Sequence, residues 1–257
     1  MADKIKLSTA QVEAGGCRWP MAQLHQRWFG DGHNRICYLE GGVGWPVVFL
    51  HGGASDSRDW VPVMAQLSAD YHVLAPDLPG FGKSSNSREQ YRVVDFTTSV
   101  ADFIEKTCDR PVALLGHSLG GRVAIELAWR RPALVERMVL VDSAGFGEVT
   151  RLGSFIIKAS DFLRRCCRRP KPYPDFDPDD LRRPKLCLEK LPSVAQPTML
   201  IWGLFDPYYP VGYARKAVTL LPDARLEVLV GCRHAPHKER PGVVAGLLAE
   251  FLQDLKR

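Results

Sequence analysis

The chain alternates short runs of aliphatic and β-branched residues with longer segments in which apolar residues recur every three or four positions. This alternation is typical of βαβ units, in which helices cover both faces of a mostly parallel sheet. It predicts an α/β fold. The expected strands are 35–40, 47–50, 72–75, 112–115, 138–141, 199–202 and 226–230. The expected helices are 59–68, 93–107, 119–130, 213–221 and 241–256.

One region, residues 146–195, interrupts the alternation because it has no strand-like run. Its apolar residues instead recur at helical spacing between Leu152 and Cys166, and a proline-rich acidic segment follows. The region lies between two expected strands and is too poor in apolar residues to fold alone. We therefore predict a single domain over residues 1–257, with 146–195 as a short helical cap insertion of the kind that often covers a site.

Length and composition exclude several classes of protein. A chain of 257 residues with 46% hydrophobic residues can bury a large core without disulfides. The longest apolar run, at 44–50, has about seven residues, whereas a membrane span needs about 20. The N-terminal residues show no apolar stretch of a secretory signal. Seven cysteines form an odd set without zinc-site spacing, which favours reduced thiols in the cytoplasm and predicts no metal.

The net charge of +5 is too small to indicate a nucleic-acid partner. The charge is concentrated locally, since five of the eight residues in 164–171 are basic. A solvated face, a patch that attracts anionic substrates and a membrane-binding surface remain three interpretations of this segment.

The sequence GHSLGG, at 116–121, carries the strongest chemical signal. It lies between an apolar strand and an expected helix, and G-x-S-x-G in that setting is typical of a nucleophile elbow. In such an elbow a sharp turn lifts the Ser118 hydroxyl above the sheet edge. Gly116 and Gly120 are expected because a Cβ at either position would clash where strand and helix approach each other.

A serine hydroxyl needs a base and an orienting carboxylate before it can act as a nucleophile. His234 follows an expected strand in a loop at the same sheet edge, and we prefer it to His237, interpreted as a surface residue. Asp206 also follows a strand, and we prefer it to Asp142, which could instead cap a helix. The chain order Ser118, Asp206, His234 is the order that this type of site uses.

These residues together make the chain resemble the α/β-hydrolases. Further matching pieces are HGGAS at 51–55, DLPGFGKS at 77–84, WGLFDPYYP at 202–210 and the spacing from His234 to Glu239 and Pro241. The resemblance implies the α/β-hydrolase fold, with a mostly parallel sheet of the eight-stranded type, helices on both faces and a short cap. It implies no cofactor.

The resemblance also assigns an oxyanion hole made of backbone N–H groups. One donor would be Leu119, directly after the nucleophile, and the other Gly53 or its neighbour Ala54. His51 would shape the early loop rather than react. Arg233 departs from the family pattern, in which glycine commonly precedes the catalytic histidine.

The leading hypothesis is a serine hydrolase, a carboxylesterase acting on a small ester or acyl substrate through an acyl-enzyme. A C–C bond (meta-cleavage product) hydrolase, or a cofactor-free haloperoxidase or perhydrolase, is the alternative on the same three residues. A non-catalytic ligand receptor on this fold is the hypothesis from another class. We expect no nucleic-acid partner and no stable membrane insertion, and the oligomeric state stays open.

Overall fold

A computed structural model describes residues 4–8, 24–169, 171, 173–177, 180 and 186–256. Cys17, one of the cysteines considered above, lies outside the described residues. The other six cysteines are free thiols. Within the described residues, no helix has both the length and the apolar character needed to cross a membrane.

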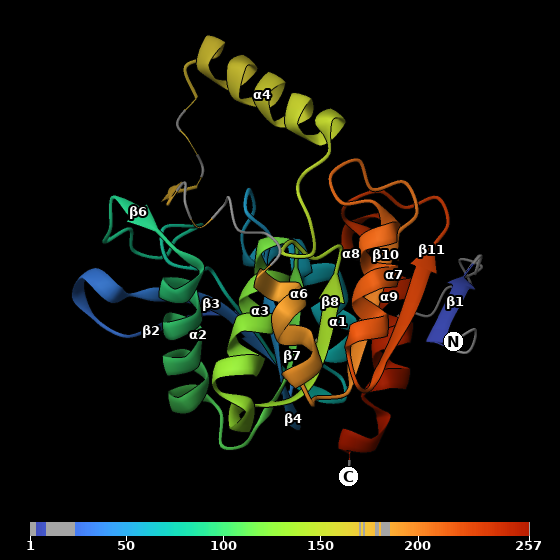
Figure 1. Cartoon of the computed structure of the whole chain (residues 1–257). Helices are drawn as coiled ribbons and strands as arrows, with labels where there is room; N and C mark the ends of the chain where they lie inside the picture. The colour runs from blue at the N-terminus through green and yellow to red at the C-terminus, as the bar shows by residue number, and fades with distance from the viewer. Residues whose placement is uncertain are drawn as a thin grey trace.

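The core of the molecule is a mostly parallel sheet of nine strands, which confirms the predicted α/β-hydrolase fold (Figure 1). The strand order is β1-β11-β10-β8-β7-β4-β5-β3-β2, and only the β2–β3 and β3–β5 pairs are antiparallel. The strands are β1 (Ile5–Ser8), β2 (His25–Phe29), β3 (Ile36–Gly41), β4 (Trp45–Leu50), β5 (Tyr71–Pro76), β7 (Val112–His117), β8 (Val135–Val141), β10 (Thr198–Gly203) and β11 (Ala224–Leu229). The N-terminal β1 extends the predicted eight-stranded type by one edge strand.

Helices cover both faces of the sheet, as predicted (Figure 1). The α-helices of the two layers are α1 (Val61–Leu67), α2 (Val93–Thr107), α3 (Leu119–Arg130), α7 (Val211–Leu220), α8 (Pro236–Glu239) and α9 (Pro241–Phe251). The 3-10 helices are Gly32–Asn34, Ser57–Trp60, Pro132–Leu134, Leu191–Ser193 and Gln253–Lys256. Helices α2 and α3 match the predicted 93–107 and 119–130 residue for residue.

Successive residues of each central strand enter opposite hydrophobic layers, because side chains alternate across a strand. In β4, Val48 and Leu50 pack with α2, α3 and α7, whereas Val47 and Phe49 pack with α1 and α9. Both layers are fully buried at these positions. The carboxyl ends of the parallel strands therefore form one rigid edge from which loops can present side chains.

Residues 146–195 leave the sheet after β8 and return at β10. Their main element is α4 (Arg151–Cys166), which Figure 1 shows standing apart from the sheet and its covering helices. A short helix, α6 (Leu186–Lys190), packs against α3. The prediction that this region has no strand was wrong, because it contains the short strand β9 (Asp175–Phe176), which pairs with β6 (Gln90–Tyr91).

Asp180 fastens this region to the helices beside the sheet. One of its carboxylate oxygens accepts the Val93 backbone N–H at 2.8 Å, and the other accepts Arg122 Nη2 at 3.1 Å. Arg122 is itself buried in α3. Because a buried guanidinium needs a partner, this contact holds Asp180 close to α2 and α3.

Candidate active site

Ser118 occupies the turn between β7 and α3, with φ +49° and ψ −111°. Few non-glycine residues adopt this conformation, and it persists only where the surrounding structure imposes it. A Cβ added to Gly116 would lie 2.3 Å from Gly120 O, and one added to Gly120 would lie 2.4 Å from Leu50 O. The predicted steric reason for these two glycines is confirmed, and the half-buried Ser118 sits on a strained elbow.

Asp206 and His234 form a hydrogen-bonded pair at the same sheet edge. Asp206 Oδ2 lies 2.8 Å from His234 Nδ1, and the Asp206 carboxylate is fully buried. Its other oxygen accepts the backbone N–H groups of Tyr208 at 2.7 Å and Tyr209 at 3.1 Å. Because the carboxylate accepts, Nδ1 carries the proton and His234 Nε2 is left as the basic nitrogen.

The loop that carries His234 is fastened directly to the elbow. His117, the residue before Ser118, donates from Nε2 to His234 O at 2.7 Å, since a carbonyl can only accept. Glu239 closes the loop from the other side, because its two oxygens accept the N–H groups of Arg233 at 2.9 Å and Ala235 at 3.2 Å. Two independent contacts thus fix His234 beside the residue that precedes Ser118.

Arg233 occupies the position where α/β-hydrolases commonly have a glycine, and it is exposed to solvent. Its backbone carries the contact to Glu239 described above. The departure from the family pattern therefore leaves the backbone hydrogen bonds of the histidine loop in place.

Asp142, the alternative carboxylate, lies next to Asp206 but in a different environment. It is fully buried, and its Oδ1 accepts the Gly203 N–H at 3.0 Å. Burial raises the pKa of Asp142 well above its usual range, and the neighbouring Asp206 charge raises it further. Asp142 is therefore held as a neutral acid, whereas Asp206 binds His234.

Asp142, Asp206 and His234 also form the one group in the described part of the chain whose ligand atoms could hold a metal ion, all within 4.8 Å of one another. Two of these atoms already bind each other in the Asp206–His234 hydrogen bond. A metal there would require this bond to break and Asp142 to lose its proton. The absence of a metal stays a prediction.

His237 is not the surface residue that the sequence suggested. It is fully buried in α8, with its ring 4.3 Å from the Trp60 ring and 4.5 Å from the His117 ring. Burial lowers its pKa to about 3, helped by the nearby Lys238 charge. The sequence could not show this burial, because a short polar segment such as 236–239 does not reveal which of its side chains pack against neighbouring elements.

The early loop after β4 lies against the start of α3. A Cβ added to Gly53 would lie 3.8 Å from Leu119 Cβ, so the two predicted oxyanion donors are neighbours. His51 donates from Nδ1 to Gly52 O at 2.8 Å, and its Nε2 accepts the Leu78 N–H at 2.9 Å. Both nitrogens are thereby used, and burial lowers the pKa of His51, so it is a neutral, loop-shaping residue.

Sequence reasoning missed the groups that orient the pair. Tyr208 and Tyr209 hold the Asp206 carboxylate through their backbone, and the Tyr208 ring lies 4.6 Å from the His234 ring. The sequence Asp-Pro-Tyr-Tyr at 206–209, shortly after the strand, was the available signal, since a carboxylate in a turn can accept the N–H groups two and three residues ahead.

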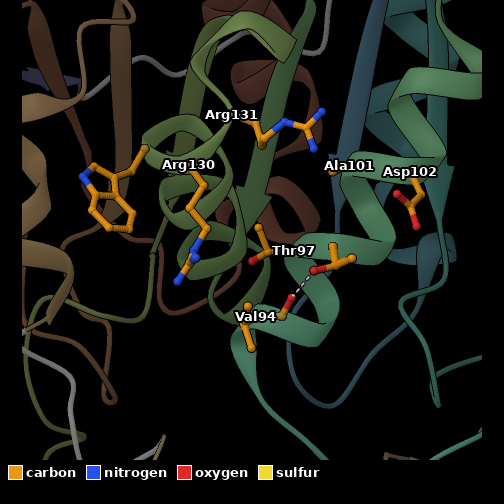
Figure 2. Close-up of a pocket in the computed structure, with 8 residues that line it drawn as sticks. Val94, Thr97, Ala101, Asp102, Arg130 and Arg131 are labelled. Atoms are coloured by element: carbon orange, nitrogen blue, oxygen red, sulfur yellow. Dashed lines mark hydrogen bonds between the residues drawn. The ribbon is translucent and has the colours of Figure 1, made fainter.

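A cavity of about 510 Å³ lies elsewhere, between α2 and α3 (Figure 2). It lies at the C-terminal turn of α3, the end opposite Ser118. Its lining residues are Val94, Thr97, Thr98, Ala101, Asp102, Trp129, Arg130 and Arg131. None of the predicted site residues reaches it.

Residues 47–247 match the family described as the alpha/beta hydrolase family. An uncharacterized protein of Mycobacterium tuberculosis is 26% identical, covering 85% of this chain and 78% of its own. The 2-hydroxy-6-oxo-6-(2'-aminophenyl)hexa-2,4-dienoic acid hydrolase of Metapseudomonas resinovorans is 26% identical, and the match covers 88% of this chain and 90% of that protein. A solved structure described as a membrane phospholipase A and bacterial virulence factor is 26% identical, with a TM-score of 0.76, and covers 93% of this chain and 89% of its own.

The buried His237 generates a prediction about stability and pH. Its pKa is about 3 in the folded protein against 6.5 ordinarily, so below pH 6.5 the unfolded chain binds a proton that the native chain rejects. Stability therefore falls as pH falls through this window. We expect the unfolding free energy to drop less between pH 7 and pH 5 in His237→Leu than in the wild type, by about 2 kcal/mol. Urea titrations at both pH values measure it, and equal losses in the two proteins would contradict the assignment.

Proposed function

The chain belongs to the alpha/beta hydrolase family, and from that premise we propose that it is a serine hydrolase that cleaves small carboxylic esters. Ser118, His234 and Asp206 form its catalytic triad in this proposal. The observation that carries it is the 2.8 Å hydrogen bond between Asp206 and His234, in a loop fastened to the residue before Ser118.

The triad assigns one proton path. The Asp206 carboxylate keeps the proton of His234 on Nδ1, so Nε2 takes the Ser118 hydroxyl proton as the oxygen attacks the ester carbonyl. The same nitrogen then returns the proton to the leaving alcohol, which leaves an acyl group on Ser118. Water, deprotonated by His234, cleaves this acyl-enzyme and regenerates the serine.

The oxyanion of each tetrahedral intermediate would be held by the backbone N–H groups of Leu119 and Gly53. Leu119 is the first residue of α3, so its N–H belongs to the positive end of a helix. Gly53 lies beside it in the loop that His51 holds. Ala54 is the other candidate for the second donor.

Residues 146–195 would form a cap insertion within a single domain, and the substrate would be a small ester or acyl compound with no cofactor. The six free cysteines support the predicted cytoplasmic location.

A C–C bond hydrolase is the second candidate. The relative from Metapseudomonas resinovorans, which is similar over 88% of this chain, is named as a hydrolase of a hexa-2,4-dienoic acid. Both reactions can use the same triad and oxyanion hole, and they differ in the substrate groups that enter from the cap side. The solved phospholipase A, similar over 93% of the chain, favours the ester.

The first test compares turnover of p-nitrophenyl acetate and butyrate by the wild-type protein and by Ser118→Ala. We expect the substitution to lower kcat by at least about 10³-fold, because it removes the nucleophile while leaving the oxyanion donors in place. Equal rates in the two proteins would refute the proposal. Loss of a meta-cleavage product, followed by absorbance, at rates above ester turnover would replace the ester with the C–C substrate.

The second test separates the two buried carboxyl groups. Asp206→Asn should lower kcat by about 10³- to 10⁴-fold, because the amide no longer holds His234 in its active tautomer. Asp142→Asn should lower it less than about tenfold, since the amide oxygen can still accept the Gly203 N–H and the uncharged side chain leaves the Asp206–His234 pair in place. The reverse order of the two effects would make Asp142 the triad acid.

A further inference from the structure

Helix α4 carries an apolar stripe, most of which the described residues leave exposed. The residues of the stripe recur every three or four positions, so they share one face of the helix. They are Leu152, Phe155, Ile156, Ala159, Phe162, Leu163 and Cys166. Leu152, Phe155, Phe162 and Leu163 are 60%, 68%, 66% and 61% exposed. Four large apolar side chains so exposed on one helix are unusual for a globular protein, and such patches mark interaction sites.

The contacts that hold α4 to the rest of the protein come from other faces of the helix. Gly153 is buried against Tyr208, and Asp161 accepts the Tyr173 hydroxyl at 2.7 Å. Asp161 lies nine residues after Leu152, which at about 100° per residue is the opposite side of the helix. The apolar stripe therefore points away from the body of the protein.

A cationic row borders the stripe. Arg151, Lys158 and Arg165 recur every seven residues, so they lie along one line beside Phe155 and Phe162, and all three residues are exposed. Arg168 and Arg169 follow just beyond the helix and are also exposed. The single acidic residue of α4, Asp161, lies opposite Leu152, away from the apolar stripe, and pairs with Arg164.

We propose that α4 binds the surface of an anionic lipid bilayer, with its apolar stripe among the acyl chains and its cationic row at the headgroups. Sixteen residues make a helix of about 24 Å, too short and too charged to span a bilayer but suited to lying in its interface. The cations favour anionic lipid over a second copy of the chain, because self-association would bring the same positive segment against itself.

The position of α4 gives this binding a consequence for the site. Thr150, the N-cap of α4, donates its hydroxyl to Pro207 O, and its N–H to Tyr208 O at 3.0 Å. These residues directly follow Asp206. A docked α4 would thus hold the Asp206 and His234 loops near the membrane surface, where apolar acyl compounds concentrate. The binding itself does not depend on the proposed esterase activity.

The test is sedimentation with phosphatidylcholine vesicles that contain or lack phosphatidylglycerol, under reducing conditions. We expect wild-type protein to pellet with the anionic vesicles. Phe155→Ser combined with Phe162→Ser should lower the partition coefficient at least about tenfold. Lys158→Glu combined with Arg165→Glu should lower it at low salt and change it little at high salt, where headgroup attraction is screened.

Matched controls lie on other elements. Val43→Ser removes a side chain of an 82% exposed residue, and Arg215→Glu with Lys216→Glu reverses two exposed charges on α7. Both should bind vesicles as the wild type does, and unchanged thermal unfolding of every variant would exclude misfolding. Wild-type protein that stays in the supernatant, or a double phenylalanine variant that binds normally, would overturn the proposal. So would a wild-type dimer that the phenylalanine substitutions dissociate, in the absence of vesicle binding.

Discussion

The close approach of β7 and α3 at Ser118 is the constraint on which the site depends. It excludes a Cβ at Gly116 and Gly120 and forces Ser118 to φ +49°. The strained backbone is held by hydrogen bonds from Ser118 N to Val141 O at 3.0 Å and from Ala144 N to Ser118 O at 3.0 Å. Strand β8 therefore braces the elbow, and neighbouring parallel strands bring the loops of Asp206 and His234 to the same edge.

The hydrogen-bond partners of the two buried carboxyl groups, Asp206 and Asp142, determine the electrostatics at this sheet edge. Asp206 accepts three hydrogen bonds, which suits a charged carboxylate. Asp142, beside it, accepts from Gly203, and burial keeps it protonated. Burial and the neighbouring Asp206 charge both favour the neutral form of Asp142, which reduces the repulsion between the two carboxyl groups.

Much of this arrangement could be predicted from the sequence, and the failures have physical reasons. Helices 93–107 and 119–130 were predictable because their apolar residues repeat strongly and face one layer. Strand β2 was missed because its sequence, HQRWF, is polar and mostly exposed at the sheet edge. The periodicity of α4 indicated which residues share a face, but the direction of that face depends on contacts with Tyr173 and Tyr208, which lie outside the helix.

The most direct test of the central claim, that Ser118 is an activated nucleophile, is covalent labelling with a fluorophosphonate followed by peptide mass spectrometry. A serine on a strained elbow with a histidine base held by a carboxylate should react with the probe, whereas a surface serine should not. We expect one stoichiometric adduct, on Ser118, that is lost when the protein is heat-denatured before labelling. No adduct on the native protein, or an adduct on another serine, would contradict it.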